Sequence, residues 1–307
     1  MKPCCLLLFA AMLTNLTAQP AHAARASKGA VYIGAAFGIH HLYKVDYDYD
    51  GVGSMTATAT VLTTLPTAAD AMIVPGGDII VAGQGPNVYK VNPDTGAFTT
   101  VSASNNGNTV SLDPSGASVW IGWTDTSPSQ VPLFPFSNGT PHSVSGGDAT
   151  ITSLAFTPSN GVYYSNGGDS GGNFGRIDLG TFTTTRLIPS LADNVHYDAF
   201  SRSLILVAGG HAIQLDAAAS TSLGSRNDSA AGENYLMLRP DGRGHLFGTR
   251  WGGGGSNPTG GRLVLVDYSE TGSLSTAIIV SAAIVDGLSG GVAVDTSILA
   301  DSFESRP

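Results

Sequence analysis

The sequence predicts an all-β protein, a β-propeller with six blades of four antiparallel strands each. The first observation is a unit of strand, turn, strand and strand that recurs about every 40 residues, the period of a propeller blade. The second is the composition, because 40 glycines and 12% charged residues suit tight turns and solvent-facing strands with little charge. The third is that the two ends of the chain carry complementary parts of one further unit. Six blades is our count, and seven is the alternative.

The repeated unit is clearest at residues 71–82, 109–121 and 153–164, and weaker copies lie at 195–206 and 235–247. One turn position of the unit is filled by Pro75, Pro114, Pro158, Ala199 and Pro240. Third strands that end in Asp or Asn are expected at 42–46, 88–92, 175–178, 213–216 and 264–267. Complete blades are predicted over 69–106, 107–149, 150–191, 192–232 and 233–284.

Two parts of this pattern depart from a regular repeat. Residues 131–136 contain Pro132 and Pro135, so the blade that holds them is predicted to be irregular, because proline cannot donate a backbone hydrogen bond. The N-terminal part begins with a second strand at 30–33, and the C-terminal part supplies a lone first strand at 291–295. Joined in one blade, the two ends close the ring and leave no open sheet edge between the first and last blades.

The first 23 residues have the pattern of an export signal. Lys2 precedes an apolar run at 6–13 that is too short to span a bilayer, and Ala21-His-Ala23 has the small residues of a cleavage site. We therefore expect a signal peptide at 1–23, a propeller domain at 24–297, a tail at 298–307, and a periplasmic or extracellular location. Both cysteines lie in the signal, so the mature chain is expected to have no thiolate nucleophile, zinc–thiolate site or iron–sulfur cluster.

Charge and hydropathy exclude several classes of partner. The net charge is −9 and no basic run occurs, so nucleic acid and anionic lipid are not expected partners. No stretch after the signal approaches 18 uninterrupted apolar residues, so no membrane span is expected. We expect a monomer whose partner is an unidentified small molecule or protein.

Polar residues precede the innermost strands of several predicted blades. Because these strands begin around one end of the central channel, their first side chains are expected to meet there. Carboxylate and amide oxygens are the ligands that Ca²⁺ prefers. The candidate metal ligands are Asp70, Asn108, Asn194 and Glu233. The alternative is that Asx, Ser and Thr residues cap turns and hydrate the channel, as they do in most propellers.

The hairpin loops expected at the same end carry further candidates. His40, His41 and His211 are candidate general bases beside the metal, or loop histidines with no such role. Candidate ligand-binding residues are Trp123, Asp125, Asp169, Arg250 and Trp251. The two tryptophans are placed either to stack on a flat ligand or to pack at blade edges. His196 and His245 lie within strands, where packing roles are expected.

The Asp, Asn and Glu residues before the inner strands resemble those of a six-bladed group that contains regucalcin-like (SMP-30-like) and paraoxonase-like lactonases and the streptogramin lyases. In that group a Glu and several Asn or Asp residues hold a channel metal, so the resemblance implies a calcium-type hydrolase or lyase. No stretch of the chain reproduces a sequence signature of those enzymes. Tyr89-Lys-Val-Asn-Pro-Asp-Thr-Gly96 resembles NHL and YVTN-type repeats, which are largely binding scaffolds. Residues 298–305 resemble the FADGFES-type endings of secreted gamma-proteobacterial proteins, which implies an exported bacterial protein.

The sequence leaves the function open between classes. The preferred interpretation is a secreted, non-catalytic propeller that binds a ligand or a protein through its channel face. The alternative is a metal-dependent lactonase, other hydrolase or lyase with Ca²⁺ in the channel. A structural repeat protein of the cell surface is a third class, which predicts neither metal nor pocket.

Overall fold

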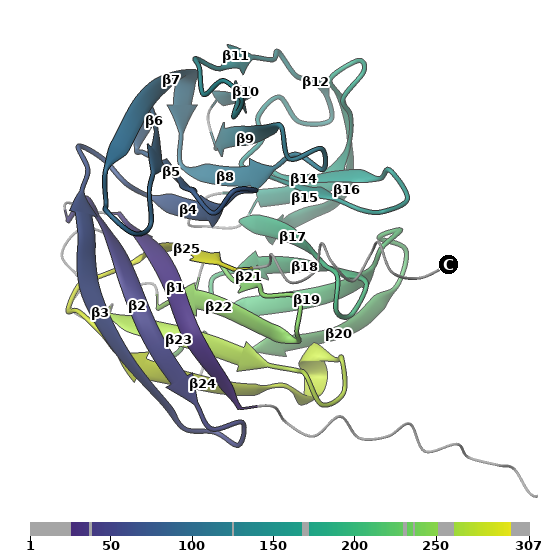
Figure 1. Ribbon diagram of the computed structural model, residues 1–307. Coiled ribbons are helices and arrows are strands. Elements are labelled where there is room, and N and C mark those ends of the chain that lie inside the picture. Colours follow the sequence, from purple (N-terminus) through teal and green to yellow (C-terminus); the bar gives the residue numbers. More distant parts are fainter. Residues whose placement is uncertain are drawn as a thin grey trace, which may run out of the picture.

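The computed structural model describes residues 26–295 except 37–38, 125, 168–171, 230–231, 236 and 251–260. The predicted signal peptide and tail lie outside these residues. The described strands form six sheets arranged as blades in a ring, which confirms the predicted all-β, six-bladed propeller (Figure 1). No helix in the described part of the chain is long and apolar enough to cross a membrane.

Each of the first three blades runs outward from a short innermost strand. The first blade is β4 (Asp70–Ile73), β5 (Ile79–Ala82), β6 (Gly85–Val91) and β7 (Phe98–Gly107). The second is β8 (Thr109–Leu112), β9 (Ser118–Trp123), β10 (Thr126–Pro132) and β11 (Thr140–Pro141). The third is β13 (Ser153–Phe156), β14 (Val162–Ser165), β15 (Gly172–Asp178) and β16 (Thr183–Ala192), with β12 (Ser145–Gly146) added in parallel outside β16.

The other three blades follow the same order. The fourth blade is β17 (Asn194–Asp198), β18 (Ser203–Ala208), β19 (His211–Asp216) and β20 (Ser222–Asn227). The fifth is β21 (Arg239–Pro240), β22 (His245–Thr249), β23 (Arg262–Asp267) and β24 (Ile278–Ala283), with a short 3-10 helix, η2 (Leu274–Thr276), before β24. The sixth is β25 (Gly290–Val294), β1 (Ser27–Ala35), β2 (His41–Tyr49) and β3 (Met55–Thr64).

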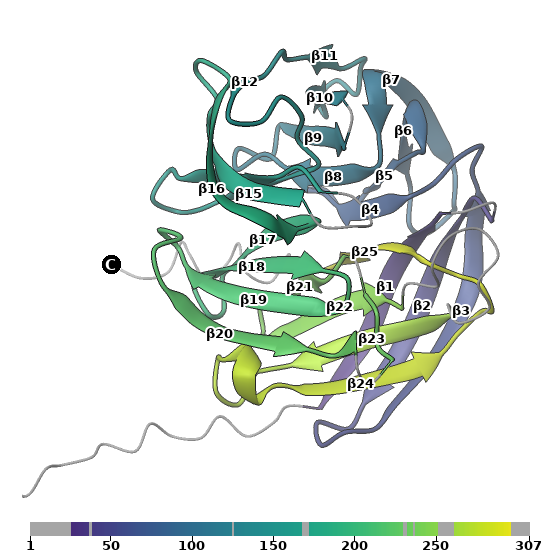
Figure 2. The ribbon, with the colours of Figure 1, turned by 180° about the vertical axis from the view of Figure 1, so that it is seen from behind.

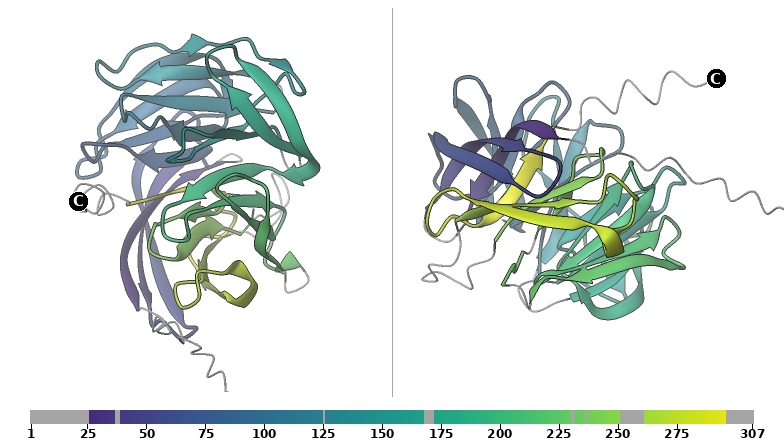
Figure 3. Two further views of the ribbon diagram at one scale, coloured as in Figure 1. Left: turned by 90° about the vertical axis from the view of Figure 1, so that its right-hand side faces the viewer. Right: turned by 90° about the horizontal axis from the view of Figure 1, so that it is seen from below.

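The two ends of the chain close the ring, as the sequence predicts. β25 pairs antiparallel with β1 from Val31 opposite Val294 to Ala35 opposite Gly290, and the view from behind shows the two strands side by side (Figure 2). The sixth blade also contacts the fifth at the periphery, where β3 lies against β24 (Figure 3). The first and last described strands, β1 and β25, therefore pair with each other and close the ring.

The core is divided among the contacts between neighbouring blades. Along β2 the buried Val45, Tyr47 and Tyr49 alternate with the exposed Asp46 and Asp48, as a strand with one face in the core requires. One apolar cluster joins strands of the fifth and sixth blades, and another joins strands of the first and second blades. Each blade thus buries its apolar face against a neighbour, which is how repeat architectures are stabilised.

Side chains join the innermost strands from one blade to the next. Three backbone N–H groups on innermost strands donate to side chains of the preceding blade: Val110 N to Asp70 Oδ2 (2.9 Å), Leu154 N to Ser111 Oγ (3.0 Å) and Val195 N to Ser153 Oγ (2.9 Å). These groups lie on the inner edges of the sheets, where no further strand follows. The side chains therefore satisfy buried donors that the ladders leave unpaired.

The second and fifth blades depart from the regular repeat. In the second, the outermost strand, β11, has only two residues, as expected for the predicted irregular blade. In the first blade the turn after β4 closes with Val74 N donating to Asp78 O, and in the fifth Asp241 N donates to His245 O. Gly242 therefore occupies the repeat position of Pro75, and the expected alignment of Pro240 was wrong by two residues. The cause is the short β21, which is preceded by a longer segment with an isolated bridge at Tyr235.

Gly290 is the first residue of β25 and lies opposite Ala35 of β1, where the C-terminal and N-terminal strands pair. We expect Gly290→Ala to lower the free energy of unfolding. A Cβ atom there would overlap the carbonyl oxygen of Gly34 on β1, and backbone cannot move aside as a flexible side chain can. Overpacking of this kind costs about 1–3 kcal/mol. Chemical denaturation measures the change, and Gly29→Ala is the matched control, because its Cβ would meet Tyr47 at an ordinary 3.5 Å. Equal stability of the two variants would contradict the prediction.

Candidate functional site

The six innermost strands define two ends of the central channel. We call the end at which these strands begin the N-terminal face, and the end at which their hairpin turns lie the turn face. Asp70 and Asn194 are the first residues of β4 and β17, and Asn108 directly precedes β8. These three predicted ligands therefore begin inner strands at the N-terminal face, as expected. Glu233 does not, because the fifth inner strand begins only at Arg239.

Asp70 is fully buried in an ion pair with Arg239 of the fifth blade. Arg239 Nη2 lies 2.8 Å from Asp70 Oδ2 and 3.1 Å from Oδ1, and it also contacts the carbonyl oxygen of Val110 at 3.3 Å. Backbone N–H groups of Ala71 and Val110 donate to the same carboxylate at 2.8 and 2.9 Å. Burial raises the pKa of Asp70, while Arg239 and these N–H groups act to lower it. Asp70 thus links the first, second and fifth blades.

The other three predicted ligands retain oxygen atoms with no described hydrogen-bond donor. Asn108 Oδ1, Asn194 Oδ1 and Glu233 Oε2 are each buried and without a partner. Glu233 Oε1 accepts a hydrogen bond of 3.0 Å from Ser281 on β24, the outermost strand of the fifth blade. Glu233 is thus held toward the periphery, whereas the two amides lie where inner strands begin.

The four predicted metal ligands do not form one ligand set in this arrangement. Both oxygens of Asp70 are occupied by Arg239 and backbone donors, and Glu233 contacts the outermost strand. Within the described ranges, no group of three or more His, Cys, Asp or Glu side chains is placed to hold a metal ion. A cation bound by all four would require Asp70 to release Arg239.

The three candidate histidines lie in hairpins at the N-terminal face, in two blades. His40 and His41 lie between β1 and β2. His40 has a left-handed φ of 48°, and its carbonyl oxygen accepts from Leu65 N at 2.9 Å. His41 begins β2 and contacts the ring of Tyr43 edge-on. His211 begins β19, opposite Ala208. Their role as general bases stays a prediction.

The candidate ligand-binding residues lie at the same face where they are described. Trp123 ends β9 and is half-buried, and its backbone N–H donates to the carbonyl oxygen of Ile151 at 3.2 Å. Arg250 follows β22 and forms the isolated bridge with Tyr235. Asp125, Asp169 and Trp251 lie outside the described residues.

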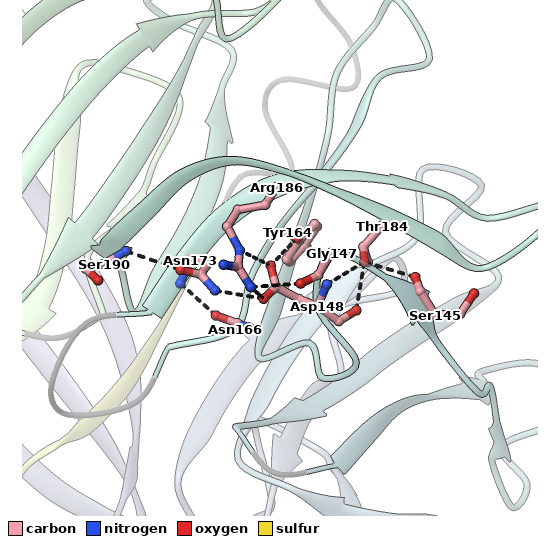
Figure 4. A network of polar contacts seen from close by, with 9 residues as sticks. All are labelled: Ser145, Gly147, Asp148, Tyr164, Asn166, Asn173, Thr184, Arg186 and Ser190. Carbon is pink, nitrogen blue, oxygen red and sulfur yellow. Dashed lines mark hydrogen bonds and ion pairs between the residues drawn. The ribbon is translucent and has the colours of Figure 1, made fainter.

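A second polar network, around Asp148, ties the connection between β12 and β13 to the strands of the third blade (Figure 4). Asp148 accepts hydrogen bonds from Tyr164 Oη (2.5 Å), Asn173 Nδ2 (2.7 Å) and two nitrogens of Arg186 (2.6 and 3.3 Å). Thr184 Oγ1 donates to the carbonyl oxygen of Asp148 and accepts from its N–H. The network holds the connection that carries β12 to its parallel position beside β16. The repeat pattern does not predict these contacts, because residue 148 lies in the connection between β12 and β13, outside the repeated strands.

Comparison with known proteins shows the fold alone. No protein-family model and no curated protein matches the sequence. Virginiamycin B lyase from Staphylococcus aureus is similar with a TM-score of 0.52 and 9% identity, covering 84% of this chain and 87% of that chain. A streptogramin B lyase structure gives a TM-score of 0.50 and 8% identity over 72% and 71% of the two chains. U3-55K gives a TM-score of 0.52 and 9% identity over 78% and 88%. The predicted likeness to streptogramin-lyase propellers is therefore confirmed as a likeness of fold, and that to NHL and YVTN repeats stays a prediction.

Proposed function

We propose that this protein is an exported, non-catalytic propeller that binds a ligand or a protein partner at the N-terminal face of its channel. The observation that carries the proposal is the pair of buried amide oxygens, Asn108 Oδ1 and Asn194 Oδ1, that have no donor. A buried acceptor without a partner costs about 1–3 kcal/mol, and a bound group that donates a hydrogen bond recovers that cost. Export rests on the signal pattern of residues 1–23.

The placement of the amides supports this proposal. Asn194 is 1% exposed and begins an inner strand, so its conformation is fixed by the ladder with β18. Hairpin loops with His40, His41, His211, Trp123 and Arg250 lie at the same face and offer further contacts. Fixed polar groups surrounded by loops are the usual arrangement of a binding face on a rigid scaffold.

Replacement of Asn194 with leucine tests whether the amide is kept for binding. We expect Asn194→Leu to leave the free energy of unfolding unchanged or to raise it by up to about 1 kcal/mol, because it removes an unsatisfied polar atom from a binding face. Asn173→Leu is the matched control and is expected to cost about 1–2 kcal/mol, because Asn173 donates to Asp148 and accepts from Ser190. Urea denaturation measures both. A loss above about 1 kcal/mol in Asn194→Leu would show a satisfied structural side chain and remove the support for the proposal.

The alternative is a metal-dependent hydrolase or lyase, favoured by the hard oxygens without donors on Asn108 and Asn194 at the N-terminal face, with the free Oε2 of Glu233 as a further ligand if its side chain turned away from Ser281. A calcium ion bound there would polarise a carbonyl oxygen of the substrate. The scaffold proposal expects no heat in a Ca²⁺ titration, no effect of chelator on the melting temperature and no turnover of a lactone panel. Calcium stabilisation together with turnover that is lost in Glu233→Gln would overturn it.

A further inference from the structure

The turn face holds an open pocket at the end of the channel opposite the proposed site. Its volume is about 380 Å³, and inner strands and hairpin turns of the first four blades line it. Its walls include one partly exposed, largely apolar side chain from each of these blades, namely Met72, Leu112, Phe156 and Tyr197. A pocket of this size with mainly apolar walls accepts a small organic molecule.

Asp113 is the charged group on the lining of this pocket. It closes the turn between β8 and β9, where its N–H donates to Ser118 O, and its side chain is half-exposed. Asp113 Oδ1 accepts from the N–H and the hydroxyl of Ser115 at 3.0 and 2.6 Å, and Oδ2 accepts from Trp120 Nε1 at 3.3 Å. These donors are uncharged, so they leave the negative charge of the carboxylate uncompensated. A carboxylate has about four acceptor positions, so Asp113 can accept a further hydrogen bond.

The turn position of Asp113 holds a different kind of group in the other complete blades. In the first and third blades it is filled by Val74 and Thr157, which carry no charge. In the fourth and fifth blades it is filled by Asp198 and Asp241, which are both buried. Among the five blades that have this turn, the second therefore presents its carboxylate to solvent at the pocket.

The positive groups near the lining are already compensated. Burial, and to a smaller extent the charge of Arg239, lowers the pKa of His196 well below its ordinary value, so this imidazole on the lining is neutral at neutral pH. Arg239 itself is paired with Asp70 at 2.8 Å. At the turn between β4 and β5, Asp78 Oδ2 lies 3.7 Å from Lys90 Nζ.

The charges beside the fourth blade offset each other in the same way. Asp198 raises the pKa of Tyr197 and Arg202 lowers it, so the wall at Tyr197 has charges of both signs behind it. Among the described residues of the lining, Asp113 therefore keeps the one uncompensated charge. A negative charge at the edge of an apolar pocket favours a ligand that carries a positive charge and an apolar part.

We propose that this pocket is a second binding site, which takes a small organic cation with a primary ammonium group on an apolar body. The ammonium group donates a charge-assisted hydrogen bond to Asp113, and the apolar body packs against Leu112 and Phe156. The site is independent of the proposed function, because its described lining belongs to the turn face and that proposal concerns the N-terminal face.

The test uses 2-naphthylmethylammonium as the probe, followed by its fluorescence and by the NMR signals of the Met72 and Leu112 methyl groups. We expect saturable binding that shifts these signals. 2-Naphthylmethanol has the same shape without the charge and is expected to bind at least about tenfold more weakly, because it replaces the charge-assisted hydrogen bond with a neutral one. Methylammonium lacks the apolar body and is also expected to bind at least about tenfold more weakly. 2-Naphthoate, which brings a second negative charge to Asp113, is expected to show no saturable binding.

Asp113→Asn separates the charge from the shape of the turn, because the asparagine Oδ1 can still accept from Ser115. We expect at least about tenfold weaker binding of 2-naphthylmethylammonium and unchanged binding of 2-naphthylmethanol. Asp178→Asn is the matched control, since Asp178 also accepts from its own turn, through Gly180 N and Thr181 N, but is exposed and lies outside the pocket lining. It removes the same charge and is expected to bind the probe as the wild-type protein does.

Absence of saturable binding, equal affinities for the ammonium and the alcohol, or unshifted Met72 and Leu112 signals would each overturn the proposal. Wild-type affinity for the ammonium in Asp113→Asn would do the same. The comparison of the four compounds on the wild-type protein decides the matter even if Asp113→Asn does not fold. Failure here leaves the N-terminal face untouched, since that proposal depends on Asn194.

Discussion

Replacing Arg239 with methionine is expected to lower the free energy of unfolding by about 3–5 kcal/mol, the largest effect of any single change considered. The reason is that Asp70 is fully buried, and its carboxylate would lose its only charged partner among the described contacts. Removing one member of a buried pair leaves an uncompensated charge, whereas the pair as a whole contributes far less. The change also breaks a link between residues 169 positions apart in the chain. Urea denaturation measures the loss.

The double variant Asp70→Asn, Arg239→Met separates the buried charge from the lost contact. We expect it to recover at least half of the stability lost in Arg239→Met, because the amide carries no charge and still accepts one backbone hydrogen bond. Arg176→Met is the surface control and is expected to cost less than about 1 kcal/mol, since Arg176 is exposed above the ring of Tyr163. If Arg239→Met and Arg176→Met were equally stable, the buried pair would have no structural role.

Replacing Asp148 with alanine is expected to cost about 2–4 kcal/mol, the second largest effect. The Asp148 side chain is 3% exposed, and the variant leaves the fully buried hydroxyl of Tyr164 without its acceptor. The cost stays below that of Arg239→Met because Arg186 is 45% exposed and regains water. Thr181→Ala, in the exposed turn before β16, is the control and is expected to change stability by less than about 0.5 kcal/mol.

The same network predicts the pH dependence. Burial alone would raise the pKa of Asp148, but hydrogen bonds from Arg186, Tyr164 and Asn173 outweigh it and lower the pKa below its ordinary value. The stabilisation is therefore complete above the pKa of the unfolded carboxyl group and is lost as the pH falls through the lower folded value. Wild-type protein and Asp148→Asn are expected to differ at neutral pH and to converge as the pH falls below about 4. A constant difference down to pH 2 would contradict this assignment.

The candidate site was only partly predictable. Its location follows from the repeat, because Asp70, Asn108 and Asn194 do lie where innermost strands begin. The repeat does not predict which of these side chains lack a hydrogen-bond partner, because the ion pair between Asp70 and Arg239 forms only in the folded ring. One feature of the sequence could have indicated the ion pair: Arg239 is a charged residue at a repeat position that in other blades holds Met72 or Ala155. Glu233 was misplaced because the alignment of the fifth blade relied on Pro240, although the turn there is set by the hydrogen bond from Asp241 to His245.

The sequence alone determined the blade period, the third strands, the irregular second blade and the closure of the ring by β25 and β1. These features depend on local alternation and turn residues, which repeat along the chain and can be compared with one another. Only the tertiary structure decided the pairing of Asp70 with Arg239 and the contacts around Asp148. Both depend on side chains that come together from separate strands and connections, so their partners are set by the folded geometry and not by spacing in the sequence.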